Sequence, residues 1–422
     1  MKTISLDLTL LAPTCIAQRP TAPGQIVETL PYLSGTALRG AVAERLLAGR
    51  RPSDLLTDDA KYFRRAFLAG EVRFANAWPQ HDTDDTQIVP RSAGQYKHDK
   101  GWRSARKGKG GKGVFDRLAD LLRLHQMDDQ GTWDALAKQA DERVSTLEPL
   151  SQSFASVNQD ADWQGGDVQR RLISRTAITP MERGLPTAGR AVAADGQLYS
   201  FEALEAGQRF RATVHGPADV LDWLKDHGLV ASEGYTKSTL TLGQGRSRGL
   251  GLVELVNIED PHEPKVRTAE TLVAHARTFS ARAGLPATKG YYLPVTLESD
   301  VILRDAYLLP CVSGDPAITL ARYRPLVTPT GTPIPMTLSE ALQSSRWLGG
   351  WDVLRQLPRP PQLAVTQGSV WVYQVPDEAQ LTAAITWWLA VALTGLGERC
   401  AEGFGRVRLV HPFHAEDRPG GW

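Results

Sequence analysis

The stretch Gly395-Leu-Gly-Glu-Arg-Cys-Ala-Glu-Gly-Phe-Gly-Arg-Val407 holds four glycines and two arginines within thirteen residues. It follows an apolar helical run and precedes Arg408-Leu-Val, so it predicts a helix end, a tight glycine-rich passage and a strand. Glycine is needed where φ is positive or where another backbone comes very close. Arginines among such glycines can offer forked donors to a phosphate, and exposed amides supply further donors.

A second stretch of the same design occurs earlier, at Gly243-Gln-Gly-Arg-Ser-Arg-Gly-Leu-Gly-Leu-Val253. Two copies, one ending each half of the chain, indicate an internal duplication. Their spacing is too large for a solenoid, so we interpret them as the ends of two related domains. The alternative is that both are only turns before edge strands.

Composition limits the classes of function. The 422 residues can form at least two cores, and 42% apolar with 23% charged residues is typical of a soluble globular protein. The net charge of +1 means that any nucleic-acid surface has to be local. Cys15, Cys311 and Cys400 show no metal-ligand spacing, which argues against structural zinc and suits a reducing cytosol. No apolar run reaches the roughly 18 residues of a membrane span, so we expect a cytoplasmic protein without cofactor or metal.

A helix start follows the first predicted strand, residues 3–12. Ser34 or Thr36 can cap a helix whose apolar positions recur every four residues. Gly35 and Gly40 leave the first turn bare on one side, and with Arg39 nearby this helix start can hold a phosphate or a passing chain. Close packing of helix on sheet at the glycines is the alternative, and the two do not exclude each other.

The order of predicted elements is that of an α+β fold with antiparallel pairing, one layer of helices on one layer of sheet. We predict an N-terminal domain at 1–258, with an insertion at about 91–167, and a C-terminal domain at 259–422. The insertion carries six positive charges and no acid between Lys100 and Lys112, either as a solvated loop or as an arm that contacts RNA or DNA. The predicted strands are 72–79, 170–178, 197–204, 208–215, 291–297, 300–303, 317–323 and 368–375; the predicted helices are 114–124, 133–147, 217–229, 266–283 and one capped by Asp377; residues 346–361 are predicted to be loop-like.

Common enzyme motifs do not appear. The stretch from Gly243 precedes a strand, whereas a dinucleotide-binding loop must open a helix. No Gly-Lys near residues 108–113 is followed by Ser or Thr, and neither a Gly-x-Ser-x-Gly elbow nor a His-Glu-x-x-His motif occurs. We interpret His215 and His411 as structural, and Asp195 is the one acid kept as a candidate for catalysis.

Taken in order, several motifs resemble those of the CRISPR-associated RAMP superfamily. They are residues 30–41, 72–79, 175–178, 198–202, 207–210, 350–352, 357–359, 368–373 and 397–407. The last four resemble more narrowly the Csx-ten type, Cas-five-like subunit of type III-D effector complexes. The resemblance implies two RRM-like, ferredoxin-like RAMP domains in tandem, each ending in a glycine-rich loop, with 179–195 as a thumb-like hairpin.

The resemblance also implies a function. Such a subunit is a non-catalytic CRISPR RNA-binding protein of antiviral defence that holds the 5′ repeat handle and meets target RNA only indirectly. Its protein partners are the large polymerase/HD-type effector subunit and the backbone RAMP subunits. The alternative is a RAMP endoribonuclease that processes CRISPR RNA or cleaves target RNA. Relatives that cleave often take a histidine or an aspartate from early loops, and residues 13–33 contain neither.

RNA held as a single strand is gripped through phosphates, 2′-hydroxyls and stacked bases. We hypothesise that the helix start and both glycine-rich stretches line one RNA path, with Trp347 or Trp351 able to stack a base. Arg406 has an alternative role in a salt bridge, and the tryptophans in a core. The candidate RNA-binding residues are Ser34, Gly35, Arg39, Gly243, Gly245, Arg246, Arg248, Gly249, Trp351, Arg399, Gly403, Gly405 and Arg406.

Overall fold

The computed structural model describes residues 1–17, 26–81, 85–97, 101–102, 113–126, 147–150, 152–157, 163–178, 193–230, 237–263, 267–352 and 357–415. Only the backbone is described at 85, 96, 124, 147, 176–178, 193–199, 351–352 and 415. Within these residues, no helix combines the length and the apolar character that a membrane crossing requires. The basic segment 100–112, apart from residues 101–102, and the predicted helix at 133–147, apart from residue 147, lie outside the described residues.

The first sheet is built around β1 (Lys2–Leu10), which pairs antiparallel with β12 (Arg209–Gly216) and with β14 (Leu252–Ile258). β13 (Ser238–Thr241) extends the sheet beyond β14, while β2 (Arg73–Phe74) and β3 (Trp78–Pro79) pair with β12. Alternate residues of β1 are buried, from Ile4 to Leu10, so the sheet has one apolar and one polar face.

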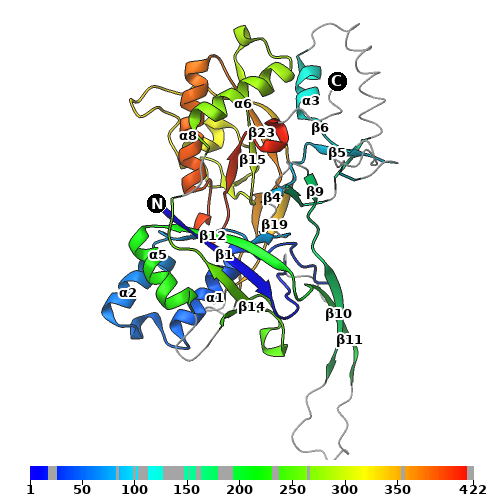
Figure 1. The fold of residues 1–422 in the computed structure, drawn as a ribbon, viewed down its shortest axis with the longest axis vertical. Helices are drawn as coiled ribbons and strands as arrows, with labels where there is room; N and C mark the ends of the chain where they lie inside the picture. The colour runs from blue at the N-terminus through cyan, green and yellow to red at the C-terminus, as the bar shows by residue number, and fades with distance from the viewer. Residues whose placement is uncertain are drawn as a thin grey trace, which may run out of the picture.

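Helices cover the apolar face of this sheet. They are α1 (Gly35–Leu47), α2 (Thr57–Phe63) with a π-helical turn (Arg64–Leu68), and α5 (Ala218–Leu224) with a second one (Lys225–Leu229). Figure 1 shows them on one side of β1 and β12. We call this sheet with its helices the first unit. Its polar face is left for other contacts.

The second sheet has the order β18-β23-β15-β24. Its strands are β18 (Thr337–Leu342), β23 (Val370–Val375), β15 (Tyr291–Leu297) and β24 (Val407–Leu409). α6 (Ala269–Arg282) and α8 (Glu378–Thr394) pack on it over a core that includes Trp371, Tyr373 and Trp388. This sheet with its helices is the second unit.

The two sheets are connected in the same way. The strand that comes first in the chain, β1 or β15, lies between the third strand and the last one. The second strand, β2 or β18, lies on the far side of the third. The spatial orders are β14-β1-β12-β2 and β24-β15-β23-β18. Each sheet ends with a helix, a glycine-rich loop and a final strand, although β13 precedes the loop in the first unit. In the first unit, where α1 and α2 follow β1 and α5 follows β12, the order of elements is β-α-β-β-α-β; in the second unit α6 precedes the first strand, β15.

The remaining elements lie around the two units. The predicted insertion and residues 85–88 just before it form two small sheets; the insertion also contains α3 (Leu118–His125), which packs against the second unit. The long hairpin β10 (Arg170–Ile178) and β11 (Ala193–Leu204) extends away from the body (Figure 1). Asp195 lies in β11, but its side chain and the hairpin tip at 179–192 lie outside the described residues. The other elements are β4 (Asp85–Ile88), β5 (Ala93–Tyr96), β6 (Val114–Asp116), β7 (Leu147–Pro149), β8 (Phe154–Val157), β9 (Trp163–Gly165), β16 (Leu303–Arg304), β17 (Pro310–Cys311), α7 (Ala321–Tyr323), β19 (Ser345–Leu348), β20 (Trp351–Asp352), β21 (Leu357–Pro358), β22 (Gln362–Val365) and α9 (Pro412–Ala415).

Three predicted elements are wrong. Residues 317–323 are helical, because the Asp315 carboxylate accepts the amide hydrogens of Ala317 and Ile318, both at 2.9 Å, and starts a helical turn. Residues 346–361 contain strands rather than a loop, and residues 114–124 begin as strand β6 before α3. The α+β class with antiparallel sheets is confirmed, as are the helix caps Ser34 and Asp377.

Candidate nucleic-acid interface

The two glycine-rich loops close in the same way. In the first loop the Leu242 amide donates to the Gly251 carbonyl at 2.8 Å; in the second the Leu396 amide donates to the Gly405 carbonyl at 2.9 Å. Between these closures each loop makes one 3₁₀ turn flanked by left-handed residues. The backbones of the two loops therefore correspond residue by residue.

Each loop also lies against the segment that follows the first strand of its own sheet. A Cβ atom on Gly243 would lie 2.2 Å from the Cys15 carbonyl oxygen, and one on Gly397 would lie 2.3 Å from that of Ile302. Glycine is thus required at both positions by close backbone approach. These contacts seat each loop at one edge of its unit.

The correspondence places unlike side chains at equivalent positions. Gly245 in the first loop, with φ of 70°, matches Arg399 in the second, with φ of 59°. Arg248 matches Glu402, so the two loops differ in charge although their backbones agree. Arg246 and Arg248 are exposed, and Arg246 forms an ion pair with Glu44 on α1.

The start of α1 is satisfied from within the protein. The Ala37 amide donates to the Ser34 hydroxyl at 3.3 Å, and the Gly35 amide donates to the Asn76 side-chain oxygen at 2.9 Å. A Cβ atom on Gly35 would lie 2.0 Å from the Phe74 carbonyl oxygen, so this glycine permits close packing of helix on sheet. Arg39 donates to the Phe67 carbonyl, and its guanidinium lies 5.6 Å from that ring.

The structure brings together two of the three parts that we expected along one path. The Thr36 hydroxyl donates to the Glu402 carbonyl oxygen at 3.3 Å, so the helix start touches the second loop. The first loop instead meets α1 at Glu44, ten residues beyond Ser34, which is about 15 Å farther along the helix axis. Trp351 lies in β20, and its side chain is outside the described set; Trp347 is half-exposed.

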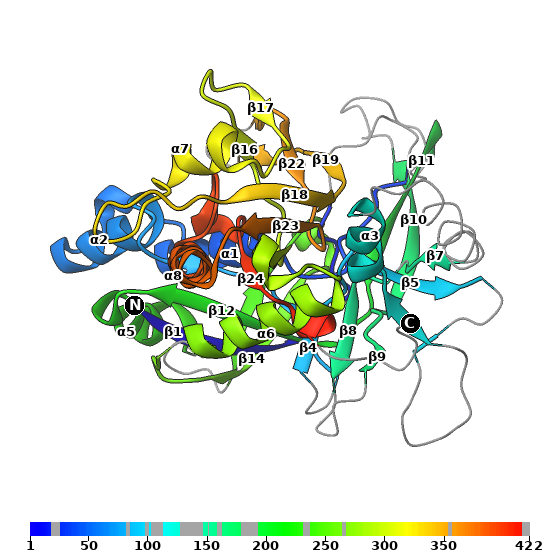
Figure 2. The same ribbon diagram turned by 90° about the horizontal axis from the view of Figure 1, so that it is seen from above.

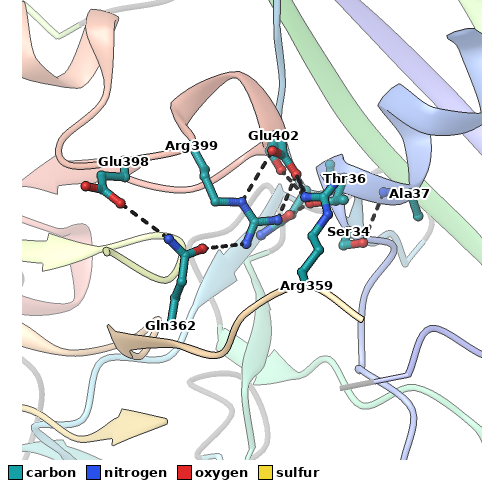
Figure 3. A network of polar contacts seen from close by, with 10 residues as sticks. Ser34, Thr36, Ala37, Arg359, Gln362, Glu398, Arg399 and Glu402 are labelled. Carbon is teal, nitrogen blue, oxygen red and sulfur yellow. Dashed lines mark hydrogen bonds and ion pairs between the residues drawn. The ribbon is translucent and has the colours of Figure 1, made fainter. Parts of the chain in front are cut away.

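Glu402 is the centre of a polar cluster at this contact. Arg399 lies 2.8 Å from its carboxylate and Arg359 lies 3.0 Å from it. Figure 3 shows the two side chains pointing toward Glu402 from different segments of the chain. Burial by itself raises the pKa of Glu402, but hydrogen bonds and charge from Arg399 and Arg359 outweigh it and lower the pKa to about 2. The carboxylate is therefore ionised at neutral pH.

A small pocket of about 140 Å³ is lined by this cluster and also by Tyr32, Arg346 and Asp300. Arg346 pairs with Asp300 at 2.6 Å and donates to the Tyr32 hydroxyl at 3.0 Å, which joins the two units. We call this space the junction pocket. The charged side chains that line it form ion pairs, Arg346 with Asp300 and both Arg359 and Arg399 with Glu402.

A larger cavity of about 680 Å³, the inter-unit cleft, adjoins the junction pocket, because Asn76 and Phe404 line both. One wall is the polar face of the first sheet, with Thr3, Ser5 and Arg211, and the other comes from α8 and β24. Figure 2 shows α8 and β24 of the second unit beside β12 and β1 of the first.

The cleft is locally positive. Arg406 and Arg408 share the carboxylate of Glu298, and the Arg406 guanidinium also lies 5.4 Å from the Trp78 ring. Arg73 and Arg267 donate to backbone carbonyls, those of Leu393 and of Leu409 and Val410. The cleft is thus lined by five arginines, with Arg211 as the fifth, and by Lys2, against two carboxylates, those of Glu259 and Glu298, in a chain whose net charge is only +1. Arg406 fills the salt-bridge role that was its alternative.

The pKa of His215 is lowered in part by the positive charges of the cleft. Burial, followed by the charges of Arg406 and Arg73, lowers its pKa to about 3, so its ring is neutral at pH 7. Its two ring nitrogens contact the hydroxyls of Thr3 at 2.9 Å and Thr213 at 3.1 Å. These contacts agree with the structural role that we expected. Among the described residues, no group of three or more His, Cys, Asp or Glu side chains is arranged to hold a metal ion.

Sequence reasoning missed most of the cleft. Arg73, Arg211, Arg267, Arg408 and Glu298 come from separate elements, and no local motif marks them. The one available signal was alternation in Arg209-Phe-Arg-Ala-Thr-Val-His215, where every second residue is polar and so must occupy one face of a strand. Which residues would face that surface was not visible in the sequence.

Comparison with known proteins gave distant likenesses of fold. No family model and no curated protein matches the sequence. A chain of the type III-B Cmr-beta complex bound to cognate target RNA and AMPPnP aligns with a TM-score of 0.41 and 8% identity, over 87% of this chain and 86% of that one. A Cas6 product complex aligns with a TM-score of 0.29 and 14% identity, over 49% and 78% of the two chains. Oligomeric Cmr4 from Pyrococcus furiosus aligns with a TM-score of 0.24 and 10% identity, over 60% and 97%.

Proposed function

We propose that this chain is a RAMP-type, non-catalytic CRISPR RNA-binding subunit of a type III interference complex, of the Csx-ten, type III-D kind. In this proposal residues 1–258 and 259–422 are tandem RRM-like RAMP domains that hold the 5′ repeat handle. The protein joins the large signalling subunit to the RAMP backbone. The motifs at residues 30–41 and 397–407 support the assignment to the family, and the inter-unit cleft supports RNA binding.

The charge of the cleft is the observation on which RNA binding depends. Single-stranded RNA is gripped mainly through its phosphates, and a groove that tracks the backbone must be positive. Arg73, Arg267, Arg406 and Arg408 supply that charge, and only Arg406 and Arg408 pair with the Glu298 carboxylate. Arg211 adds a half-exposed cation on the polar sheet face, the kind of surface that RRM domains offer to RNA.

The contacts of His215 support a non-catalytic role. RNA cleavage without a metal needs a general base close to a 2′-hydroxyl. His215 and His262 line the cleft, and Thr3 and Thr213 occupy both ring nitrogens of His215. A base held in this way is not free to take a proton from RNA.

We test the proposal with purified protein and 5′-labelled CRISPR RNA that carries its repeat handle, with and without divalent metal. We expect a handle-dependent shift and intact RNA. Arg211→Ala should weaken binding roughly fivefold and reduce the slope of log affinity against log salt by about 0.7, the value for one phosphate contact on a single strand. Arg246→Ala with Arg248→Ala should act in the same direction if the first loop lies on the path.

Arg277→Ala is the matched control for Arg211→Ala. Both arginines pair with a carboxylate, Arg277 with Glu378 and Arg211 with Asp7, and their side chains are 47% and 49% exposed. Arg277 lies on α6, outside the cleft. Equal effects of the two variants would remove the cleft from the proposal, and discrete metal-independent cleavage products would replace it with the nuclease alternative.

A further inference from the structure

The donors around Glu402 form a cradle for an anion. Arg399 offers Nη2 at 2.8 Å and Nε at 3.3 Å, Arg359 offers Nη1 at 3.0 Å, and the Thr36 hydroxyl lies 3.3 Å from Oε2. Two guanidinium groups and a hydroxyl converging on one acceptor are the donors that a phosphate group also uses. Figure 3 shows that they come from α1, the second glycine-rich loop and the segment after β21.

The loop itself does not require an acid at position 402. The first loop has the same closure and the same 3₁₀ turn with Arg248 at the equivalent place. The carboxylate of Glu402 is therefore a feature of the side chain and not of the turn. It supplies the negative charge that Arg359 and Arg399 face.

Arg399 is held in place against its backbone preference. It adopts the left-handed conformation, with φ of 59°, where its equivalent in the first loop is Gly245. A non-glycine residue in this conformation is strained, and such strain persists where the side chain is needed. The guanidinium lies 4.6 Å from the Phe404 ring, which fixes its plane beside the junction pocket.

The cradle has an entrance and room. It lines the junction pocket, whose volume of about 140 Å³ is several times the ~15 Å³ that one water needs. The pocket shares Asn76 and Phe404 with the positive cleft. A phosphate that reaches the end of the cleft is thus adjacent to the cradle.

We propose that Arg359, Arg399 and Thr36 form a phosphate-binding site that Glu402 fills as an internal substitute, and that a phosphate displaces Glu402 from it. The site takes one phosphate group, either free or at an end or within a nucleic-acid chain. Assigning the natural ligand to the CRISPR RNA rests on the function proposed above. In the absence of RNA, Glu402 remains paired with Arg359 and Arg399 and in contact with Thr36 of α1.

The first test uses Glu402→Gln, which keeps the shape of the side chain and removes its charge. In chloride buffer this variant should melt at a lower temperature than the wild type, since two arginines lose their partner. Inorganic phosphate should restore it, with an affinity at least tenfold higher than that of the wild type. Glu402→Asp, which keeps the charge but shortens the side chain, should be intermediate, and it serves if the glutamine variant does not fold.

Glu398→Gln is the matched control in the same loop. Glu398 also accepts from an arginine, Arg304 at 2.7 Å, and it reaches the cradle only through Gln362, which donates to Glu398 at 3.3 Å and accepts from Arg399 at 3.1 Å. Phosphate should leave its melting temperature unchanged relative to the wild type. Equal phosphate effects in both glutamine variants, or no phosphate effect on Glu402→Gln, would reduce the cluster to a structural ion pair.

A second arm identifies the source of the phosphate. Binding of 5′-phosphorylated and 5′-hydroxyl handle RNA is compared in the wild type and in Glu402→Gln. A gain confined to the phosphorylated RNA assigns a terminal phosphate; an equal gain for both assigns one within the chain. If Glu402→Gln binds phosphate but no variant binds RNA, the site stands and the proposed function fails. If the wild type binds RNA and Glu402→Gln gains affinity for neither phosphate nor RNA, the proposed function stands and the phosphate site fails.

Discussion

Gly249 and Gly251 stand two residues apart in the first glycine-rich loop, and both have positive φ, 79° and 80°. Their surroundings differ. Around a Cβ atom on Gly249 there is no atom within 4 Å, whereas a Cβ atom on Gly251 would lie 1.9 Å from the Leu242 carbonyl oxygen. The two glycines therefore separate the effect of φ from the effect of close backbone approach.

Alanine substitution at these two glycines should give different losses of stability. We expect Gly249→Ala to lower the free energy of unfolding by about 1 kcal/mol, which is the effect of positive φ alone. Gly251→Ala should lower it by about 3 kcal/mol or more, because the methyl group must also push apart the loop closure. Urea unfolding of both variants measures the difference, and similar losses would contradict the role assigned to close approach.

At the scale of the element, α1 links the two units through its first turn. Gly35 packs on the Phe74 carbonyl and faces the second loop near Glu402, whereas Gly40 in the same helix has open space around it. The helix thus contains one glycine that packing requires and one that it does not. Both were seen in the sequence as bare backbone at a helix start.

The pair Gly35→Ala and Gly40→Ala should shift stability in opposite directions. Gly40→Ala should stabilise the protein by about 0.5 to 1 kcal/mol, because alanine is the better helix former. Gly35→Ala should destabilise it by about 1 to 3 kcal/mol through overpacking. Thermal or urea unfolding checks both signs; stabilisation by Gly35→Ala would show that the contact with β2 is loose.

At the scale of the whole molecule, the cleft exists only because two sheets of the same connectivity lie against each other. His215 belongs to the first unit, and Arg406 belongs to the second. Burial is the largest cause that lowers the pKa of His215, and the charge of Arg406 is the next. In the folded protein the pKa of His215 is about 3, well below the ordinary value of 6.5 for an imidazole. The folded state therefore stays neutral at His215 where the unfolded state takes up a proton.

The stability contributed at His215 should be intact above pH 6.5 and should fall as the pH drops toward 3. Because the unfolded chain binds the extra proton in this window, the loss can reach about 1.4 kcal/mol for each pH unit. His215→Gln removes the proton uptake, so its stability should depend less steeply on pH between 6.5 and 4. Unfolding free energies of both proteins across this range give the comparison, and parallel curves would contradict the burial of a neutral ring.

The parts of the fold that were predicted correctly are governed by local chemistry. Strand 291–297 was predicted with the bounds it has, and Asp377 caps α8 through a hydrogen bond from the Gln380 amide. Residues 317–323 failed because Ile318 and Thr319 favour a strand locally, while the Asp315 cap and the burial of Leu320 impose a helical turn. Of the candidate site, Ser34 and Arg399 line the junction pocket, and Gly403 and Arg406 line the inter-unit cleft. Glu402, which pairs with Arg399, was not selected.

The sequence by itself determined the two glycine-rich loops, since positive φ and close backbone approach leave only glycine at their closures. It also determined the alternation that gives the first sheet a polar face. Only the tertiary structure decided what lies opposite that face. The cleft joins Arg73, Arg211 and Arg408 from three strands with Arg406 from the loop before β24, and the cradle joins Thr36 to Arg359 and Arg399. Their proximity follows from strand order and from the packing of one unit on the other, which depend on contacts far apart in the chain and leave no local pattern in it.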